Sequence, residues 1–170
     1  MTLDERTIPP QVADERTSLA AYLDFHRDTL ALKCGGLTDA ELRTRAVPPS
    51  ILSLLGLVRH MTEVERGWFA NRIAHRNLPP VYYSEPDNPD GDFLDLDSAD
   101  VATVFAAWRE ACAESRDIVA RAESLEVLGK RGDGSDVSLR WIMMHMLEEY
   151  ARHNGHADLL RERIDGATGE

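Results

Sequence analysis

The stretch LRWIMMHMLEEYARHNGHADLLRERI, residues 139–164, gives the clearest helical signal in the chain. Its apolar side chains recur at intervals of three and four residues, the spacing that gathers them on one face of an α-helix. Ser138 precedes the stretch as a candidate N-cap, and Gly166 follows it where a glycine commonly ends a helix. We therefore predict one long amphipathic helix. Its apolar positions are Leu139, Ile142, Met143, Met146, Tyr150, Ala157, Leu160 and Ile164.

Two polar residues interrupt this apolar face. Glu149 and His153 stand four positions apart, one helical turn, in line with the apolar residue Met146. A carboxylate on a core-facing stripe is costly unless a cation or hydrogen-bond donors compensate its charge. A divalent metal ion would supply that compensation. An ordinary surface pair of glutamate and histidine is the alternative.

Three earlier segments of the chain show the same helical spacing. Ser50 is the expected N-cap of the second segment, and Ser98 or a neighbour that of the third. Each segment is therefore predicted to be an amphipathic helix. The stripes are Leu19, Tyr22, Leu23, His26 and Leu30; Leu54, Leu57, Met61, Val64 and Trp68; and Val101, Val104, Phe105, Trp108, Cys112 and Val119.

The segments between these helices carry turn and loop signals. Gly35 and Gly36 end the first helix, and the run from Thr38 to Glu41 matches the capping box of a short connecting helix. The proline-rich, acidic stretch 75–97 is expected to be a loop, and a turn is expected from Gly129 to Gly134. Residues 87–92 faintly resemble a calcium loop, but Pro86 would fall at the first ligand position, so we expect a solvated acidic loop.

Four long amphipathic segments, with no alternating strand pattern and no internal repeat, predict an all-α fold, a four-helix bundle. A length of 170 residues suits one domain with its own core. We expect a single domain over residues 1–170, in which residues 1–10 form a flexible lead.

Composition excludes several classes of function. A net charge of −11 would repel a phosphate backbone, so no nucleic acid is expected as a partner. The acidic N-terminus lacks the features of a signal peptide, and no segment approaches the ~18 apolar residues of a membrane span. We expect a cytoplasmic protein that does not bind membranes. Cys34 and Cys112 are interpreted as small buried apolar residues.

His60 belongs to the apolar face of the second long helix, with Leu57 and Val64 on the same side. Helices that pack together can bring His60 to the same point as Glu149 and His153. Two histidines and one carboxylate suit zinc, nickel, iron or manganese and leave positions open for water and substrate. The sequence therefore suggests a divalent metal site on His60, Glu149 and His153.

Other histidines compete for this role. His156 lies almost in line with Glu149, and His145 is offset toward the flank, so either remains an alternative ligand. His60 itself has the alternative of a hydrogen-bonded core histidine. His26, alone on its helix, is interpreted as structural, and His75 as exposed to solvent.

Four runs of this sequence are distinctive: Lys33–Leu37, Pro49–Met61, Val64–Phe69 and His145–Leu160. Together they resemble the DinB/YfiT-like metalloenzyme superfamily, most closely its actinobacterial single-domain branch. The resemblance extends from about Leu19 to Ile164. It implies metal ligands in the middle of the second long helix and four residues apart on the last helix, which here are His60, Glu149 and His153.

Relatives in this superfamily include mycothiol-dependent maleylpyruvate isomerase and S-transferases that use mycothiol or bacillithiol. The resemblance implies that an open position on the metal, zinc foremost, binds the sulfur of such a low-molecular-weight thiol and lowers its pKa for attack on a small electrophile. A metal-dependent hydrolase and a non-catalytic metal-binding or ligand-binding bundle are the alternatives. No general base stands out among Glu148, His145, His156, Tyr150 and Arg152. A homodimer is expected, because relatives of this architecture often pair.

Overall fold

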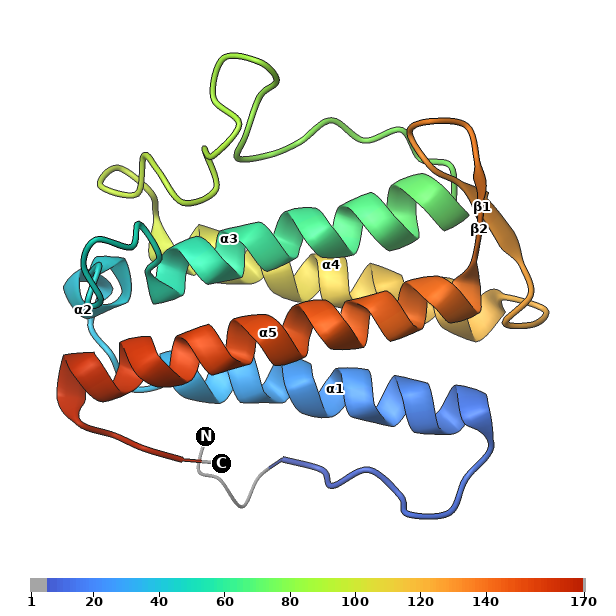
Figure 1. Cartoon of the computed structure of the whole chain (residues 1–170), viewed down its shortest axis with the longest axis horizontal. Coiled ribbons are helices and arrows are strands. Elements are labelled where there is room, and N and C mark those ends of the chain that lie inside the picture. The colour runs from blue at the N-terminus through green and yellow to red at the C-terminus, as the bar shows by residue number, and fades with distance from the viewer. Residues whose placement is uncertain (1–5, 170) are drawn as a thin grey trace.

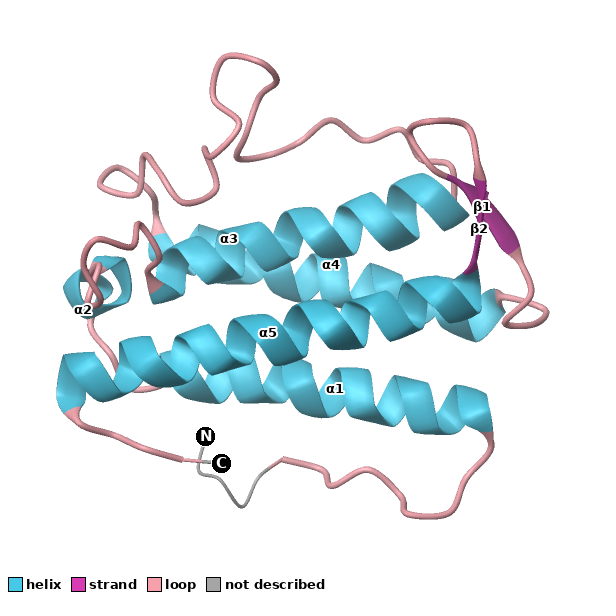
Figure 2. Ribbon diagram, in the orientation of Figure 1, coloured by secondary structure: helices cyan, strands magenta, loops and turns pink. Residues whose placement is uncertain are grey.

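The computed structural model describes residues 6–169, which are mostly helical, as predicted (Figure 2). Of the expected lead, residues 1–5 lie outside the described residues, and 6–10 form neither helix nor strand. None of the described helices combines the length and apolar character needed to cross a bilayer. The elements are α1 (Glu15–Cys34), α2 (Asp39–Arg43), α3 (Leu54–Glu65), the π-helix η2 (Arg66–Ile73), α4 (Val101–Arg121), β1 (Leu128–Lys130), β2 (Asp136–Ser138) and α5 (Leu139–Asp165).

The long helices run lengthwise beside one another (Figure 1). α1 packs along α5, α3 packs along α4, and α3 also meets α5. The apolar face of each helix contributes to one buried cluster, and each fully buried leucine or methionine contributes about 1.5–3 kcal/mol. The side chains least exposed to solvent include Leu30, Leu57, Met61, Met146 and Tyr150.

The helix ends follow from local chemistry. The capping box of Thr38 and Glu41 is present, and the Ser138 side chain accepts a hydrogen bond from the backbone of α5, both as predicted. The N-cap of α3 is Ser53, not Ser50 as predicted. The Ser50 hydroxyl instead accepts a hydrogen bond from Leu52 N in the turn before the helix. The N-cap of α4 is Asp100, a neighbour of Ser98, and its side chain accepts a hydrogen bond from Thr103 N.

Two features were not predicted. The expected turn after α4 lies inside an antiparallel hairpin, which pairs Leu128 with Ser138 and Lys130 with Asp136. Its strands have three residues each, too few to show an alternating pattern. Gly129 packs against the Arg72 carbonyl where a side chain would collide. The other feature is η2, in which the predicted second helix continues with a wider turn beyond residue 65.

Residues 74–100 form the predicted loop, which crosses over α3 (Figure 1). Side chains of α3 hold it in place. The buried Arg59 guanidinium donates to the carbonyls of Gly91 and Leu94 at 2.9 Å each. The Glu63 carboxylate accepts the backbone N–H groups of Val81 and Tyr82 at 2.6 Å each. The loop therefore forms a fixed wall beside the helix.

Candidate metal centre

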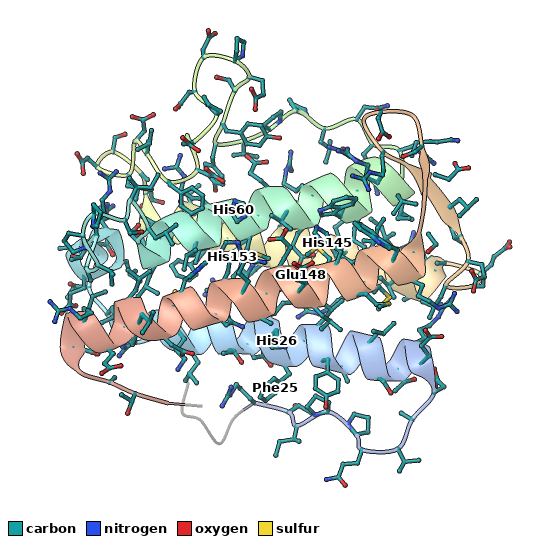
Figure 3. All side chains as sticks on the ribbon, viewed as in Figure 1. Phe25, His26, His60, His145, Glu148 and His153 are labelled. Atoms are coloured by element: carbon teal, nitrogen blue, oxygen red, sulfur yellow. The ribbon has the colours of Figure 1, made fainter. Side chains whose placement is uncertain are left out.

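His60, Glu149 and His153 converge between α3 and α5. Each offers one ligand atom, and these atoms all lie within 4.8 Å of one another. The rings of His60 and His153 are 4.7 Å apart, centre to centre. Figure 3 shows His60 on α3 facing His153 on α5. The structure therefore brings together the three residues that the sequence suggested, as a two-histidine, one-carboxylate set.

The cluster has a buried floor and an open side. Glu149 and His153 stand one turn apart on α5, with His153 Nε2 3.4 Å from Glu149 Oε2. The His153 side chain is 11% exposed, whereas those of His60 and Glu149 are 25% and 23% exposed. A small molecule can therefore reach the donors from outside without unfolding the helices.

Asp92, in the loop, holds His60 from behind. Its Oδ2 lies 2.7 Å from His60 Nδ1, and its side chain is only 9% exposed. Because Nδ1–H donates to this carboxylate, Nε2 keeps the lone pair with which an imidazole binds a metal. Phe93 stacks on the same ring at 5.1 Å. Sequence reasoning missed Asp92, since an acidic residue in a proline-rich loop carries no periodic signal.

The two competing histidines lie beside the cluster, not in it. His145 Nε2 is 3.3 Å from Glu149 Oε1, and His156 Nδ1 is 3.4 Å from His153 Nδ1. Burial and the neighbouring His153 lower the pKa of His156. Each member of the predicted set therefore has an outer neighbour that orients it, which is the usual second layer of a protein metal site.

A metal ligand set needs an ionised carboxylate, and the surroundings of Glu149 favour its ionised form. The hydrogen bond with His153 and the nearby imidazoles of His145 and His60 lower the pKa of Glu149, against burial, which raises it. In the described chain, no lysine or arginine forms an ion pair with this carboxylate. A half-buried carboxylate surrounded by imidazoles fits a divalent cation, and these donor types suit zinc, nickel, iron or manganese.

A cavity of about 350 Å³ adjoins the cluster. The loop and the α3–η2 helix form its walls, and its size is within the ~300–1,000 Å³ range of small-molecule pockets. His60 and its partner Asp92 belong to its lining, so the cavity reaches one of the three proposed ligands directly. The other lining residues include Glu63, Trp68, Arg72, Tyr83 and Glu85.

The remaining candidates lie elsewhere. His26 is on α1 (Figure 3), where Asn154 Nδ2 donates to its carbonyl at 3.0 Å. His75 is exposed. Cys34 and Cys112 are free and buried, and burial raises the pKa of each thiol to about 12. Both thiols are therefore protonated at neutral pH, and neither can act there as a nucleophile.

A second polar cluster, which sequence reasoning missed, lies deep between the helices. The Arg27 guanidinium donates to both oxygens of Glu65, at 2.8 and 2.9 Å, and the Tyr150 hydroxyl donates to Glu65 Oε1 at 2.7 Å. Trp108 and Cys112 complete it. Burial and the charge of Glu65 raise the pKa of Tyr150 well above its usual value, so Tyr150 is no general base.

Two of the other candidate bases form no ion pair with a proposed ligand, although Glu148 Oε2 lies 3.4 Å from His145 Nδ1. Arg152 and Glu148 pair with each other on the surface of α5, with 3.4 Å between their charged atoms. Of the candidates named from the sequence, only His145 and His156 adjoin the proposed metal ligands.

The fold and the matched family together define a protein of the DinB/YfiT-like superfamily, as the sequence resemblance indicated. A family model described as "MST: Mycothiol-S-transferase" matches residues 18–166, and the chain belongs to that family. Among solved structures, a conserved protein of locus from Enterococcus faecalis has a TM-score of 0.67 at 13% identity. The alignment covers 92% of this chain and 100% of that one, and it shows a shared fold alone. A search of curated proteins gave no significant match.

Proposed function

We propose that this protein is a metal-dependent S-transferase that joins a mycothiol-type, low-molecular-weight thiol to a small electrophile. The observation that carries the proposal is the convergence of His60, Glu149 and His153 within 4.8 Å, at the edge of a cavity of about 350 Å³. Membership in the mycothiol S-transferase family supports the same reaction class.

Zinc is the metal that we propose first, with nickel, iron and manganese as alternatives, because imidazole and carboxylate donors suit all four. When bound, the metal would lower the pKa of a coordinated thiol, so that the thiolate predominates at neutral pH. The chain's own cysteines remain protonated, so the reacting sulfur must come from the small thiol. The chain must then supply a binding site for the electrophile and an acceptor for the proton of the thiol.

The side chains around the proposed ligands have separate tasks. Asp92 keeps the proton of His60 on Nδ1, and His156 lies against Nδ1 of His153, so that the Nε2 atoms face the site. His145 carries its own proton on Nε2, 3.3 Å from Glu149 Oε1, so the proton that the thiol loses passes to its Nδ1, which lies 3.4 Å from Glu148 Oε2. With a haloaromatic substrate, the sulfur lone pair forms the new C–S bond, and the halide leaves with the carbon–halogen bonding pair.

The wider setting of the site is also part of the proposal. We take the four long helices to form a four-helix bundle of the superfamily type, as one domain over residues 1–170. We further propose a cytoplasmic homodimer, a state that sedimentation at micromolar protein concentration would test.

The test begins with the metal-free protein, reloaded separately with zinc, nickel, iron or manganese. Thiol consumption is then followed with 1-chloro-2,4-dinitrobenzene and mycothiol, bacillithiol or glutathione. We expect a rate that requires metal and saturates with mycothiol. It should collapse in His60→Ala and persist in His75→Asn, which alters an exposed histidine outside the cluster.

Circular dichroism of both variants should show unchanged helix content, because neither substitution removes a core-filling apolar side chain. A metal-loaded protein that is inert with all three thiols across a panel of electrophiles would refute the transferase proposal. Hydrolysis of an ester panel by that same protein would then favour the metal-dependent hydrolase. No reaction in either assay would leave a non-catalytic metal-binding or ligand-binding protein.

A further inference from the structure

An arginine in the wall of the cavity lacks a hydrogen-bond partner among the described residues. Arg72, on η2, lines the cavity together with Trp68 and Tyr83. Its Nε is buried and has no hydrogen-bond partner. Its guanidinium lies 5.7 Å from the centre of the Trp68 ring, and within residues 6–169 it forms no ion pair with a carboxylate. The cavity therefore contains a cationic group whose N–H donors are not used by the described residues.

Arg72 differs in this respect from the other arginines of the described chain. Every other arginine that is partly or fully buried donates at least one guanidinium hydrogen bond to the protein. The others without such a hydrogen bond are all exposed to water: Arg76, Arg109, Arg121, Arg131 and Arg163. Among the described residues, Arg72 is the one partly buried arginine whose guanidinium makes no hydrogen bond to the protein, and its buried Nε is a polar group left unpaired, which is costly.

The acidic side chains of the same cavity do not supply that anion. The Glu63 carboxylate is occupied by the backbone N–H groups of Val81 and Tyr82. Asp92 is occupied by His60, and Glu85 is exposed. The fork of N–H donors on Arg72 therefore remains available to a ligand, and its geometry matches a carboxylate.

We infer that Arg72 binds a carboxylate group of the electrophilic substrate, so that the site selects small electrophilic acids. The aromatic rings of Trp68 and Tyr83 in the same walls suit a planar, aromatic or unsaturated body. His60 lines the cavity as well, so one ligand can meet both Arg72 and the thiol-binding side of the site. The role of Arg72 as a substrate anchor rests on the proposed transferase function. Its binding of a carboxylate does not depend on that function.

Binding of benzoate to the zinc-loaded protein, compared with the neutral benzamide, tests the inference by isothermal titration calorimetry. We expect benzoate to bind about tenfold more tightly, the size of effect typical of a hydrogen bond to a charged group. Arg72→Gln should abolish that preference. Arg72→Lys, which keeps the charge but not the fork, should retain part of it.

Arg131→Gln is the matched control, because Arg131 lies over the Trp141 ring at 5.6 Å but on the exposed surface. It should bind benzoate as the parent does. Equal binding of benzoate and benzamide by the parent would overturn the inference. So would an unchanged preference in Arg72→Gln, since the carboxylate would then be held elsewhere, for example by the metal.

A kinetic comparison extends the test to the reaction. The ratio of kcat/KM for 4-chloro-3-nitrobenzoate over 4-chloro-3-nitrobenzamide should fall about tenfold in Arg72→Gln. An unchanged ratio would contradict the role of Arg72 as a substrate anchor. A protein that is inert toward every thiol but still prefers benzoate through Arg72 would refute the transferase and leave the carboxylate site standing.

Discussion

Glu65 and Glu149 are both glutamates between the helices, but their charges are compensated in different ways. Glu65 is fully buried, and both of its oxygens accept from Arg27, at 2.8 and 2.9 Å. Tyr150 adds a third hydrogen bond at 2.7 Å. Glu149 is 23% exposed on its side chain and meets only imidazoles, at 3.3 Å from His145 and 3.4 Å from His153.

This difference separates a structural ion pair from a candidate ligand site. A buried carboxylate that the chain itself neutralises has no unused capacity, so the Arg27–Glu65 cluster is closed. A carboxylate that faces an open side with imidazoles around it can accept a cation from solution. The four experiments below test the contrast, in order of decreasing expected effect.

The closed cluster should matter most for stability. Arg27→Met leaves the Glu65 carboxylate buried without its cation, and we expect a loss of about 3–5 kcal/mol in the free energy of unfolding. Urea denaturation measures it. Zinc affinity should stay within about twofold of the parent, a change near 0.4 kcal/mol.

The double variant Arg27→Met with Glu65→Leu is the control for this prediction. Replacing both charges by apolar side chains removes the uncompensated carboxylate, so most of the lost stability should return. A double variant as unstable as Arg27→Met alone would show that packing, not charge, causes the loss.

The open cluster should matter most for metal binding. His153→Ala removes one of the proposed ligands, and the affinity for zinc should fall by more than about a hundredfold, beyond the loss from an outer partner. Titration against a chromophoric chelator measures this. Metal-free His153→Ala should unfold at nearly the same urea concentration as the metal-free parent. Unchanged zinc affinity would disprove the ligand assignment.

Asp92 should have a smaller effect on the metal. Asp92→Asn weakens the hold on His60 Nδ1, and a loss of about 10–100-fold in zinc affinity is typical of such partners. Nitrogen-15 NMR of the imidazoles should show that His60 no longer keeps one tautomer. Asp90→Asn makes the same charge change at a nearby exposed residue and should leave both measurements unchanged.

His26 belongs to neither cluster and should give the smallest effect. Burial lowers its pKa below 6.5 in the folded protein, so between the two pKa values the unfolded chain binds more protons. Stability therefore falls as the pH drops from 6.5 toward the folded pKa. His26→Phe should remove that part of the pH dependence in urea denaturation at pH 7.5 and 5.5, about one unit either side of the ordinary histidine pKa near 6.5. An identical pH profile would contradict the assignment.

The parts of the structure that could be predicted from the sequence are those that depend on residue spacing along a helix. The stripes of α1, α3, α4 and α5 and the capping box at Thr38 are local patterns, and the structure contains them. His60, Glu149 and His153 could be singled out because each interrupts such a stripe, and the family resemblance selected them from the other histidines. Whether they bind metal remains a prediction.

The parts that the sequence did not predict depend on contacts between distant residues. Asp92 meets His60 only because the loop folds back over α3, and no spacing along the chain indicates this. Arg27 and Glu65 are different, because Glu65 follows Met61 by one helical turn and Arg27 follows Leu23 likewise. The reasoning applied to Glu149 would have flagged both residues as polar groups on apolar faces.

The loop over α3 is attached through neighbouring residues of a single helix segment: Arg59, His60 and Glu63 bind its backbone or side chains. The helix thus provides fixed attachment points, and the loop segment between them can vary in sequence. Residues 83–90 lie between two of these attachment points and supply Tyr83, Glu85 and Pro89 to the cavity. Substitutions in residues 83–90 can therefore change one wall of the cavity while the helical interior and its stability stay the same.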